Sequence, residues 1–269
     1  MERPACRCSA APRTRTIALA DAHMSFKDHF SRQAAAYSRY RPAYPRALIE
    51  YVAAQSPGRR LAVDCATGNG QAAVALAEWF AAVLAVDASS SQLARAEPHP
   101  RVHYVASLAE RLPARDHSVD MVVAAQAAHW FDFGRFHAEC RRVLVRDGVV
   151  AVWTYEKFRV NDAVDAVIDD FYVNVVGGDW PPERRYVEQG YRTLPFPWRE
   201  QPTPVFQLEI DWDLPQLMGY LATWSAVQRC RDRLGRDPLA TLEPRLAAHW
   251  PRAGAMRLRW PIHLRLGRA

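Results

Sequence analysis

The 269-residue chain lacks any apolar run close to the roughly 18–20 residues that a membrane span needs, which predicts a soluble protein with no membrane partner. It also has few cysteines. Cys6, Cys8, Cys65, Cys140 and Cys230 are odd in number, and a chain of this length does not need a disulfide framework. The first two have no second ligand pair nearby, so no metal site is predicted. Free thiols fit a reducing compartment, and we expect a cytoplasmic protein.

Net basic charge, which would indicate a nucleic-acid partner, is missing from the body of the chain. The formal net charge is +6, but residues 1–23 and 252–269 carry nine basic and two acidic residues. The interior therefore holds 26 of the 35 basic and 27 of the 29 acidic residues. The Asn/Asp-Pro-Pro-Tyr/Phe tetrapeptide of amino-methylating DNA enzymes is also absent from the sequence. We expect no nucleic-acid partner.

The first residues have no apolar core of the kind that a secretory signal carries. Residues 1–23 are rich in Arg and Ala, whereas the segment from Met24 has the character of a natural start. We predict a disordered extension over 1–23, followed by a single domain over 24–269.

Short apolar strands alternate with helical segments between residues 60 and 155. Strands are predicted at 60–64, 81–87, 102–107, 118–126 and 149–155, and helices at 70–80, 89–98 and 133–145. Such βαβ units predict an α/β fold with a parallel sheet and helices on both faces.

The alternation of short strands and helices ends after Tyr155. Helical stretches are predicted at 156–176, 214–234 and 238–250, around an excursion at 177–202 that is rich in Pro, Gly, aromatics and Arg. Alternating segments at 205–212 and 256–266 are expected to pair at the edge of the sheet. We assign 156–204 and 213–252 as insertions on the substrate side.

A glycine turn follows the first predicted strand. In "DCATGNG", Asp64 ends the strand, and Gly68 and Gly70 precede a helix, where they permit positive φ and close approach of a ligand to backbone N–H groups. Asp87 ends the next strand, where an acid binds ribose hydroxyls in nucleotide-type sites. The pattern predicts a nucleotide-like cofactor.

Two cofactors compete for this turn. Gly68-x-Gly70-x-x-Ala73 satisfies the dinucleotide fingerprint, so an NAD(P)-dependent oxidoreductase is one alternative. The carboxylate of Asp64 would repel a pyrophosphate, but it suits the ammonium group of S-adenosylmethionine. The acid therefore favours S-adenosyl-L-methionine as the cofactor.

Several further segments carry a family resemblance that covers Phe26 to the C-terminus. They are "YSRYRPAYP" (37–45), "VDCATGNGQAA" (63–73), "AVDASSSQL" (85–93), "AERLPARDHSVDMVVAAQAAHWFD" (109–132), "RVLVRDGVVAVWTY" (142–155), "YRTLPFPW" (191–198) and "YLATWSA" (220–226). The chain resembles class I S-adenosylmethionine-dependent methyltransferases of the type-11 group, especially trans-aconitate methyltransferases and related small-molecule enzymes. The resemblance implies a Rossmann-like, seven-stranded, mostly parallel sheet with an antiparallel last strand. It also implies an N-terminal lid over 24–55.

The resemblance further implies the cofactor contacts, which are Tyr37, Arg41, Asp64, Ala66, Gly68, Gly70, Asp87, Ala109, Glu110 and Gln126. Two positions depart from the family pattern. Ala66 replaces the first glycine of D-x-G-x-G-x-G, and its methyl group disfavours positive φ. Leu108 stands where relatives often have an Asp that meets the adenine amino group, so we expect that contact from the Ala109 backbone or another donor and acceptor pair.

The resemblance places the segment after the fourth strand beside the methyl donor. Trp130 could wall the sulfonium, because cations favour aromatic faces. His129 is a candidate base, with a hydrogen bond to neighbouring backbone as the alternative. In the excursion, Arg184, Arg185 and Arg192 would bind a carboxylate substrate or else form a solvated loop. Trp180 would line the pocket.

We predict methyl transfer to a small organic molecule, with a carboxylate as one acceptor that would need no general base. A phenol, amine or carbon acid would need one, from His129 or Glu156. The NAD(P)-dependent oxidoreductase and a protein that binds S-adenosylmethionine without turnover are the alternatives. A monomer or a homodimer is expected.

Overall fold

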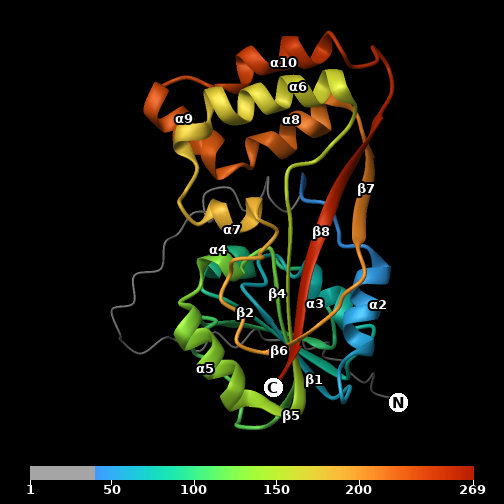
Figure 1. Cartoon of the computed structure of the whole chain (residues 1–269), viewed down its shortest axis with the longest axis vertical. Coiled ribbons are helices and arrows are strands. Elements are labelled where there is room, and N and C mark those ends of the chain that lie inside the picture. Colours follow the sequence, from blue (N-terminus) through green and yellow to red (C-terminus); the bar gives the residue numbers. More distant parts are fainter. Residues whose placement is uncertain (1–39) are drawn as a thin grey trace, which may run out of the picture.

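The computed structural model describes residues 40–269. The predicted extension over 1–23 and Tyr37 lie outside the described residues, as does the lid segment before residue 40. Eight strands form one sheet, namely β1 Leu61–Cys65, β2 Ala82–Asp87, β3 Val102–Ala106, β4 Val119–Ala125, β5 Leu144–Tyr155, β6 Arg199–Gln201, β7 Phe206–Trp212 and β8 Met256–Arg268 (Figure 1).

The sheet is ordered β3-β2-β1-β4-β5-β8-β6, and β7 also pairs with β8. Strands β1 to β5 are parallel, whereas β8 runs antiparallel to β5, which confirms the predicted antiparallel last strand. The strand count is eight rather than seven. The 13-residue β8 pairs with β7 along Met256–Ile262 and with the short β6 along Leu266–Arg268, so two strands share one edge.

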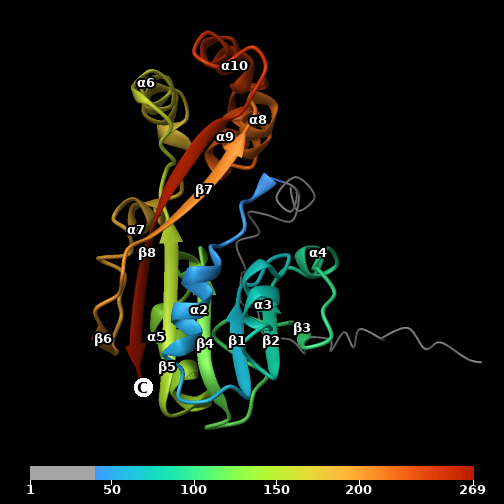
Figure 2. The ribbon, with the colours of Figure 1, turned by 90° about the vertical axis from the view of Figure 1, so that its right-hand side faces the viewer.

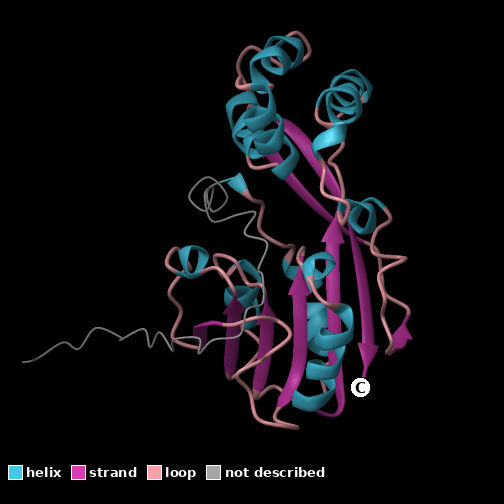
Figure 3. Ribbon diagram, turned by 90° about the vertical axis from the view of Figure 1, so that its left-hand side faces the viewer, coloured by secondary structure: helices cyan, strands magenta, loops and turns pink. Residues whose placement is uncertain are grey.

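Alternating side chains bury both faces of the central strands. In β1, Ala62 packs in the cluster that contains α2 (Arg46–Ala54) and α3 (Gln71–Leu76), whereas Val63 and Cys65 pack with α5 (Phe133–Val143). Figures 2 and 3 show α2 and α3 on one face and α5 on the other. This is the predicted arrangement, with helices packed on both faces of the parallel sheet.

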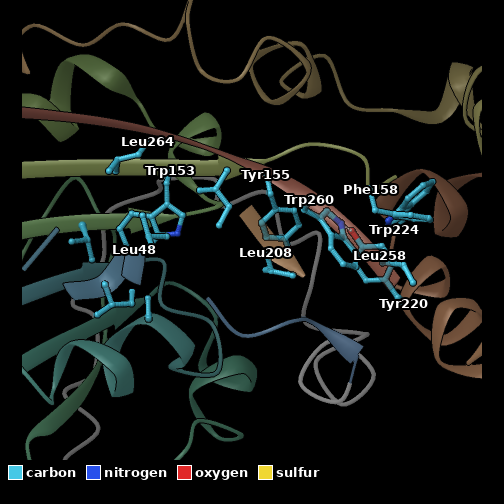
Figure 4. Packing of buried hydrophobic residues seen from close by; sticks show 14 of the residues in the cluster. Leu48, Trp153, Tyr155, Phe158, Leu208, Tyr220, Trp224, Leu258, Trp260 and Leu264 are labelled. Carbon is cyan, nitrogen blue, oxygen red and sulfur yellow. Dashed lines mark hydrogen bonds between the residues drawn. The ribbon is translucent and has the colours of Figure 1, made fainter. Parts of the chain in front are cut away.

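A cap of four helices stands beyond the carboxyl end of β5. The helices are α6 Asp162–Asp170, α8 Leu214–Ala222, α9 Ser225–Leu234 and α10 Leu239–Ala247 (Figure 1). The β7–β8 pair extends from the sheet to the cap (Figure 2). One hydrophobic cluster runs along it, from Trp153 in the sheet through Trp260 to Tyr220 and Trp224 in the cap (Figure 4). Because burial of a large apolar side chain stabilises by about 1.5–3 kcal/mol, this cluster fixes the cap on the sheet.

The remaining helices are short. They are α4 Ser90–Leu93, α7 Arg184–Glu188, the 3-10 helices Ala128–Trp130 and Gly177–Asp179, and a π-helix at Phe171–Val175. The predicted helices at 70–80 and 89–98 are therefore shorter than expected. The predicted helix at 214–234 is divided, because the hydroxyl of Thr223 donates to the Tyr220 carbonyl and Trp224 is extended. Among residues 40–269, no helix combines the length and apolarity that a membrane crossing demands.

Candidate active site

The strand order reverses between β1 and β4, which lie side by side in the sheet. Ligands of open α/β sheets bind at the carboxyl ends of the strands next to such a reversal. The glycine loop 64–70 leaves the sheet at the end of β1, and the segment 126–130 leaves it at the end of β4. The two segments that the sequence singles out are therefore neighbours.

Asp64 is fully buried at the base of the glycine loop. Its Oδ2 accepts a hydrogen bond of 2.6 Å from the Thr67 hydroxyl, and its Oδ1 is buried without a partner among the described residues. Burial raises the pKa of Asp64 to about 7, the charge of Asp87 raises it further, and the Thr67 hydrogen bond opposes the shift. A buried acceptor without a donor is costly, and a ligand cation would satisfy it.

The loop adopts the left-handed backbone that the glycines predicted. Gly68 has φ +59° and Gly70 has φ +91°. A Cβ on Gly70 would lie 2.1 Å from the Tyr104 hydroxyl, whereas nothing lies within 4 Å of a Cβ on Gly68. Ala66 also has a positive φ of 52°, so the loop keeps this conformation despite the methyl group. A side chain at 70 would thus have to displace the Tyr104 ring, whereas at 68 the backbone faces open space among the described residues.

Asp87 connects the glycine loop to the end of β2. Its Oδ2 accepts from the Gly68 N–H and its Oδ1 accepts from the Ser89 N–H, each at 2.8 Å. The two residues predicted near the adenine ring are already in contact with other parts of the chain. Ala109 is buried in the α5 cluster, and Glu110 accepts from the Asp132 N–H at 2.9 Å.

Gln126 holds the ends of β4 and β5 together. Its Oε1 accepts from the Thr154 hydroxyl (2.7 Å) and the Tyr155 N–H (2.8 Å), and its Nε2 donates to the Tyr155 carbonyl (3.1 Å). The backbone φ of Gln126 is +56°, an uncommon value that these bonds maintain. The side chain still borders the pocket beyond the strand ends.

His129 is buried, and its Nδ1 lies 2.7 Å from the hydroxyl of Tyr191. Burial lowers the pKa of His129 to about 3, and the positive charge of Arg184 contributes. The ring is therefore neutral near pH 7 and a weak base. This favours the hydrogen-bonding alternative, although the partner is the side chain of Tyr191 rather than backbone.

A pocket lies between the strand ends and the helical cap. The sheet side contributes Gln126, Trp130 and Tyr155, and the cap side contributes Tyr220 and Trp224. Among the described residues, the cationic side chains of Arg41, Lys157 and Arg184 also border it, as do Trp180 and Glu156. As it stands, the pocket encloses about 50 Å³.

The described end of the predicted lid packs against this pocket. Arg41 donates to the Tyr155 hydroxyl (3.0 Å), and its guanidinium lies 5.3 Å from the ring centre of Tyr220. Its backbone carbonyl accepts from Gln71 at the start of α3. Tyr44 meets Trp153 edge to face.

The three predicted substrate arginines are not brought together. Arg184 borders the pocket, where its guanidinium lies over Trp180 (4.5 Å) and its Nε donates to the Tyr172 hydroxyl (2.8 Å). Arg185 is exposed and lies over Tyr186, and Arg192 is exposed as well. Neither of the exposed arginines borders the pocket.

Four residues at or beside the pocket were not predicted from the sequence, namely Lys157, Tyr172, Tyr191 and Tyr220. Lys157 pairs with Asp169, and its ammonium lies 5.0 Å from the ring centre of Tyr172. No local motif marks these positions, since each is brought to the site by packing between segments that follow β5. In the part of the chain that the structure describes, no group of metal-binding side chains is found.

Comparisons with known proteins decide the family. Residues 63–152 match the model of the methyltransferase domain. A Dictyostelium discoideum protein named as a methyltransferase is 30% identical over 204 residues, which is 74% of this chain and 78% of the relative. This chain is a class I S-adenosylmethionine-dependent methyltransferase. It also resembles a solved structure described as a type II methyltransferase from Anaeromyxobacter dehalogenans, with 47% identity, a TM-score of 0.80 and coverage of 85% of this chain and 98% of the other.

A third relative bears on the cofactor of this methyltransferase. The Saccharomyces cerevisiae protein named as an S-adenosylmethionine-dependent methyltransferase is 31% identical over 132 residues, or 46% of this chain and 45% of the relative. S-adenosylmethionine is therefore the cofactor, and the nicotinamide alternative is not supported. Among residues 40–269, the Oδ1 of Asp64 is buried without a partner and the backbone at Gly68 is open, which fits a cofactor that carries an ammonium group and no phosphate.

Proposed function

We propose that this methyltransferase acts on a small organic acceptor that carries a carboxylate, bound in the pocket between the strand ends and the helical cap. The observation that carries the proposal is the pocket itself. Glu156, Trp180 and Arg184 come from the predicted insertion 156–204, and Tyr220 and Trp224 come from 213–252. Both insertions thus contribute to one wall of the pocket. The residues at the strand ends, beside the loops proposed to bind the cofactor, form the other wall.

The cofactor site is proposed to follow the residues that the sequence singled out. Asp64 Oδ1 would accept from the ammonium group, and the positive φ of Gly68 leaves backbone open beside the same ligand. Asp87, whose carboxylate is oriented by two backbone donors at the end of β2, would accept from the ribose hydroxyls. Gln126 and Arg41 would contact the cofactor from the pocket side, together with Ala66, Gly70, Ala109, Glu110 and Tyr37, the last of which lies outside the described residues.

The residues of the chain have mainly to orient the acceptor and to exclude water. When bound, S-adenosylmethionine supplies a methyl group on sulfur, which an acceptor atom takes by in-line displacement while the bonding pair returns to sulfur. A carboxylate acceptor needs no proton removed. His129, with a pKa of about 3, is a poor base, and its role here is to position Trp130, whose ring centre lies 4.7 Å from its own.

The test is incubation with methyl-labelled S-adenosylmethionine and a panel of small carboxylates, phenols and amines, with products identified by mass spectrometry. The proposal predicts methyl esters among the products. Label only in phenol or amine products would refute the carboxylate acceptor. Label in none of the panel, despite tight cofactor binding, would refute small-molecule transfer to these classes.

A further inference from the structure

Arg184 forms no ion pair with an acid among the residues that the structure describes, and only the Tyr172 hydroxyl links it to the Glu188 carboxylate. Its Nε donates to the Tyr172 hydroxyl, and its two terminal nitrogens have no hydrogen-bond acceptor among residues 40–269. Lys157, the other cation on this side of the pocket, is neutralised by Asp169. A half-buried guanidinium normally finds a carboxylate or phosphate, so the unused donors of Arg184 indicate an acceptor from outside the chain.

A second unused donor lies in the same wall. The indole Nε1 of Trp180 is buried and has no hydrogen-bond partner among the described residues. Buried donors without partners are rare and costly, so each one needs a physical explanation. Since the guanidinium of Arg184 lies 4.5 Å from the ring centre of Trp180, the two donor groups belong to one small region. A single anionic group could satisfy both.

The walls around these donors are aromatic. The ring centres of Trp180 and Trp224 are 5.5 Å apart, those of Tyr172 and Trp224 are 5.7 Å apart, and Tyr220 follows at 6.1 Å from Trp224. Glu156 is the only acid among the described residues that border the pocket, and its carboxylate lies 2.8 Å from the His263 ring. Cationic side chains already lie over the rings of Tyr172, Trp180 and Tyr220, which disfavours a quaternary ammonium there, whereas among residues 40–269 none lies over Trp224.

We propose that the acceptor is an aromatic acid, whose anionic group is bound by Arg184 and the Trp180 indole N–H and whose ring packs on Trp224. This inference rests on the proposed function, because it names the substrate class of the same pocket. It assigns the carboxylate a recognition site and separates Arg184 from Arg185 and Arg192, which the sequence alone grouped together.

The pocket must enlarge to admit such a ring. Its present volume of about 50 Å³ holds about two water molecules. The guanidinium of Arg184 now covers Trp180, and a single side-chain hydrogen bond, to Tyr172, holds it there. Arg184 can therefore leave the indole face and follow the incoming anion at low cost. The π-helix that carries Tyr172 is a backbone irregularity typical of functional sites.

The experiment measures binding of benzoate, benzamide, propane-1,2,3-tricarboxylate and phenyltrimethylammonium by calorimetry, in the presence of S-adenosylhomocysteine. We expect benzoate to bind most tightly. Arg184→Gln should weaken benzoate binding about tenfold or more, because a charge-assisted pair is lost. Arg184→Lys should have an intermediate effect, and Trp180→Phe, which removes only the N–H from an aromatic ring, should weaken it several-fold.

The matched control is Arg185→Gln, which removes a neighbouring arginine that does not border the pocket. It should change benzoate affinity less than twofold, and all four variants should bind S-adenosylhomocysteine like the wild type. Equal effects of Arg184→Gln and Arg185→Gln, or tighter binding of benzamide, the tricarboxylate or the ammonium than of benzoate, would overturn the inference and leave methyl transfer standing. Failure of the wild type to bind S-adenosylhomocysteine would instead refute the proposed function.

Discussion

The Nδ1 atom of His129 lies 2.7 Å from the hydroxyl of Tyr191, and both side chains are buried. This hydrogen bond joins the segment after β4 to the part of the excursion 177–202 that lies beyond α7 (Arg184–Glu188). The histidine in this pair is neutral, because burial lowers the pKa of His129 to about 3. A ring fixed in this way orients its neighbours, and it does not take protons from a substrate near pH 7.

His129 should make the fold sensitive to acid. The unfolded histidine takes up a proton below its ordinary pKa of 6.5, whereas the folded one stays neutral down to about 3, so stability is lost as pH falls through this window. The loss is at most about 1.4 kcal/mol per pH unit. Denaturant titrations between pH 7 and 4 should show a smaller loss for His129→Asn, whose side-chain amide can keep the Tyr191 contact. An equal loss in both proteins would contradict the buried neutral histidine.

Cofactor binding should depend on the ionisation of Asp64. Because the pKa of this carboxyl is about 7 in the free protein, binding an ammonium group requires the proton to leave below that pH. Affinity for S-adenosylhomocysteine should therefore weaken by up to about tenfold per unit as pH falls below 7, and level off above it. Calorimetry from pH 5.5 to 8.5 measures this.

The control for that titration is Asp64→Asn, which cannot ionise. Its affinity should be weaker than that of the wild type at pH 8 and flat across the range. A wild-type affinity that does not change with pH would show that Asp64 is not the partner of the ammonium group.

The two glycines of the loop should differ in their tolerance of a side chain. Gly70→Ala would place a Cβ 2.1 Å from the Tyr104 hydroxyl, whereas Gly68→Ala meets only the cost of a positive φ. We expect the first to lower the free energy of unfolding by more than 2 kcal/mol and the second by about 1 kcal/mol. Urea unfolding separates them. The same loss at both positions would mean that Tyr104 does not enclose the turn.

Ala66 should be a strained position that glycine relieves. A left-handed alanine costs about 1–2 kcal/mol, of which glycine returns part through the entropy of the unfolded chain. Ala66→Gly should thus stabilise the protein by about 0.5–1 kcal/mol in urea unfolding. Ala75→Gly in α3 is the control and should destabilise by about the same amount. A loss of stability in Ala66→Gly would contradict the left-handed geometry.

Most of the sheet was predictable from residue patterning. Strands buried on both faces give short apolar runs, and the helices that cover them carry one apolar side, so β1 to β5 and α5 follow from the sequence. The start of β5 did not. The sequence predicted a helix up to residue 145 and a strand only from residue 149, yet the strand begins at Leu144 and continues through Asp147 at φ +60°, with a register shift against β4. At these residues, pairing of β5 with its neighbouring strands outweighs the local sequence preference for a turn.

The candidate site residues also fall into two groups, those placed by local sequence and those placed by packing between distant segments. The glycine turn and Asp87 were predictable because each is local to a strand end. Arg184 and Arg185 are adjacent and chemically alike, and only the orientation of α7 against the cap places the first in the pocket. Tyr191 and Tyr172 are likewise set by contacts between segments distant in sequence, which no local pattern encodes.

The central claim is that S-adenosylmethionine binds at the glycine loop beside Asp87. Calorimetric titration of S-adenosylhomocysteine into the wild type and Asp87→Ala, with NADH titrated in parallel and folding checked by thermal unfolding, tests it most directly. We predict saturable binding of S-adenosylhomocysteine to the wild type, its loss in a variant that remains folded, and no binding of NADH. Unaltered affinity in Asp87→Ala, or NADH binding in place of S-adenosylhomocysteine, would contradict the account.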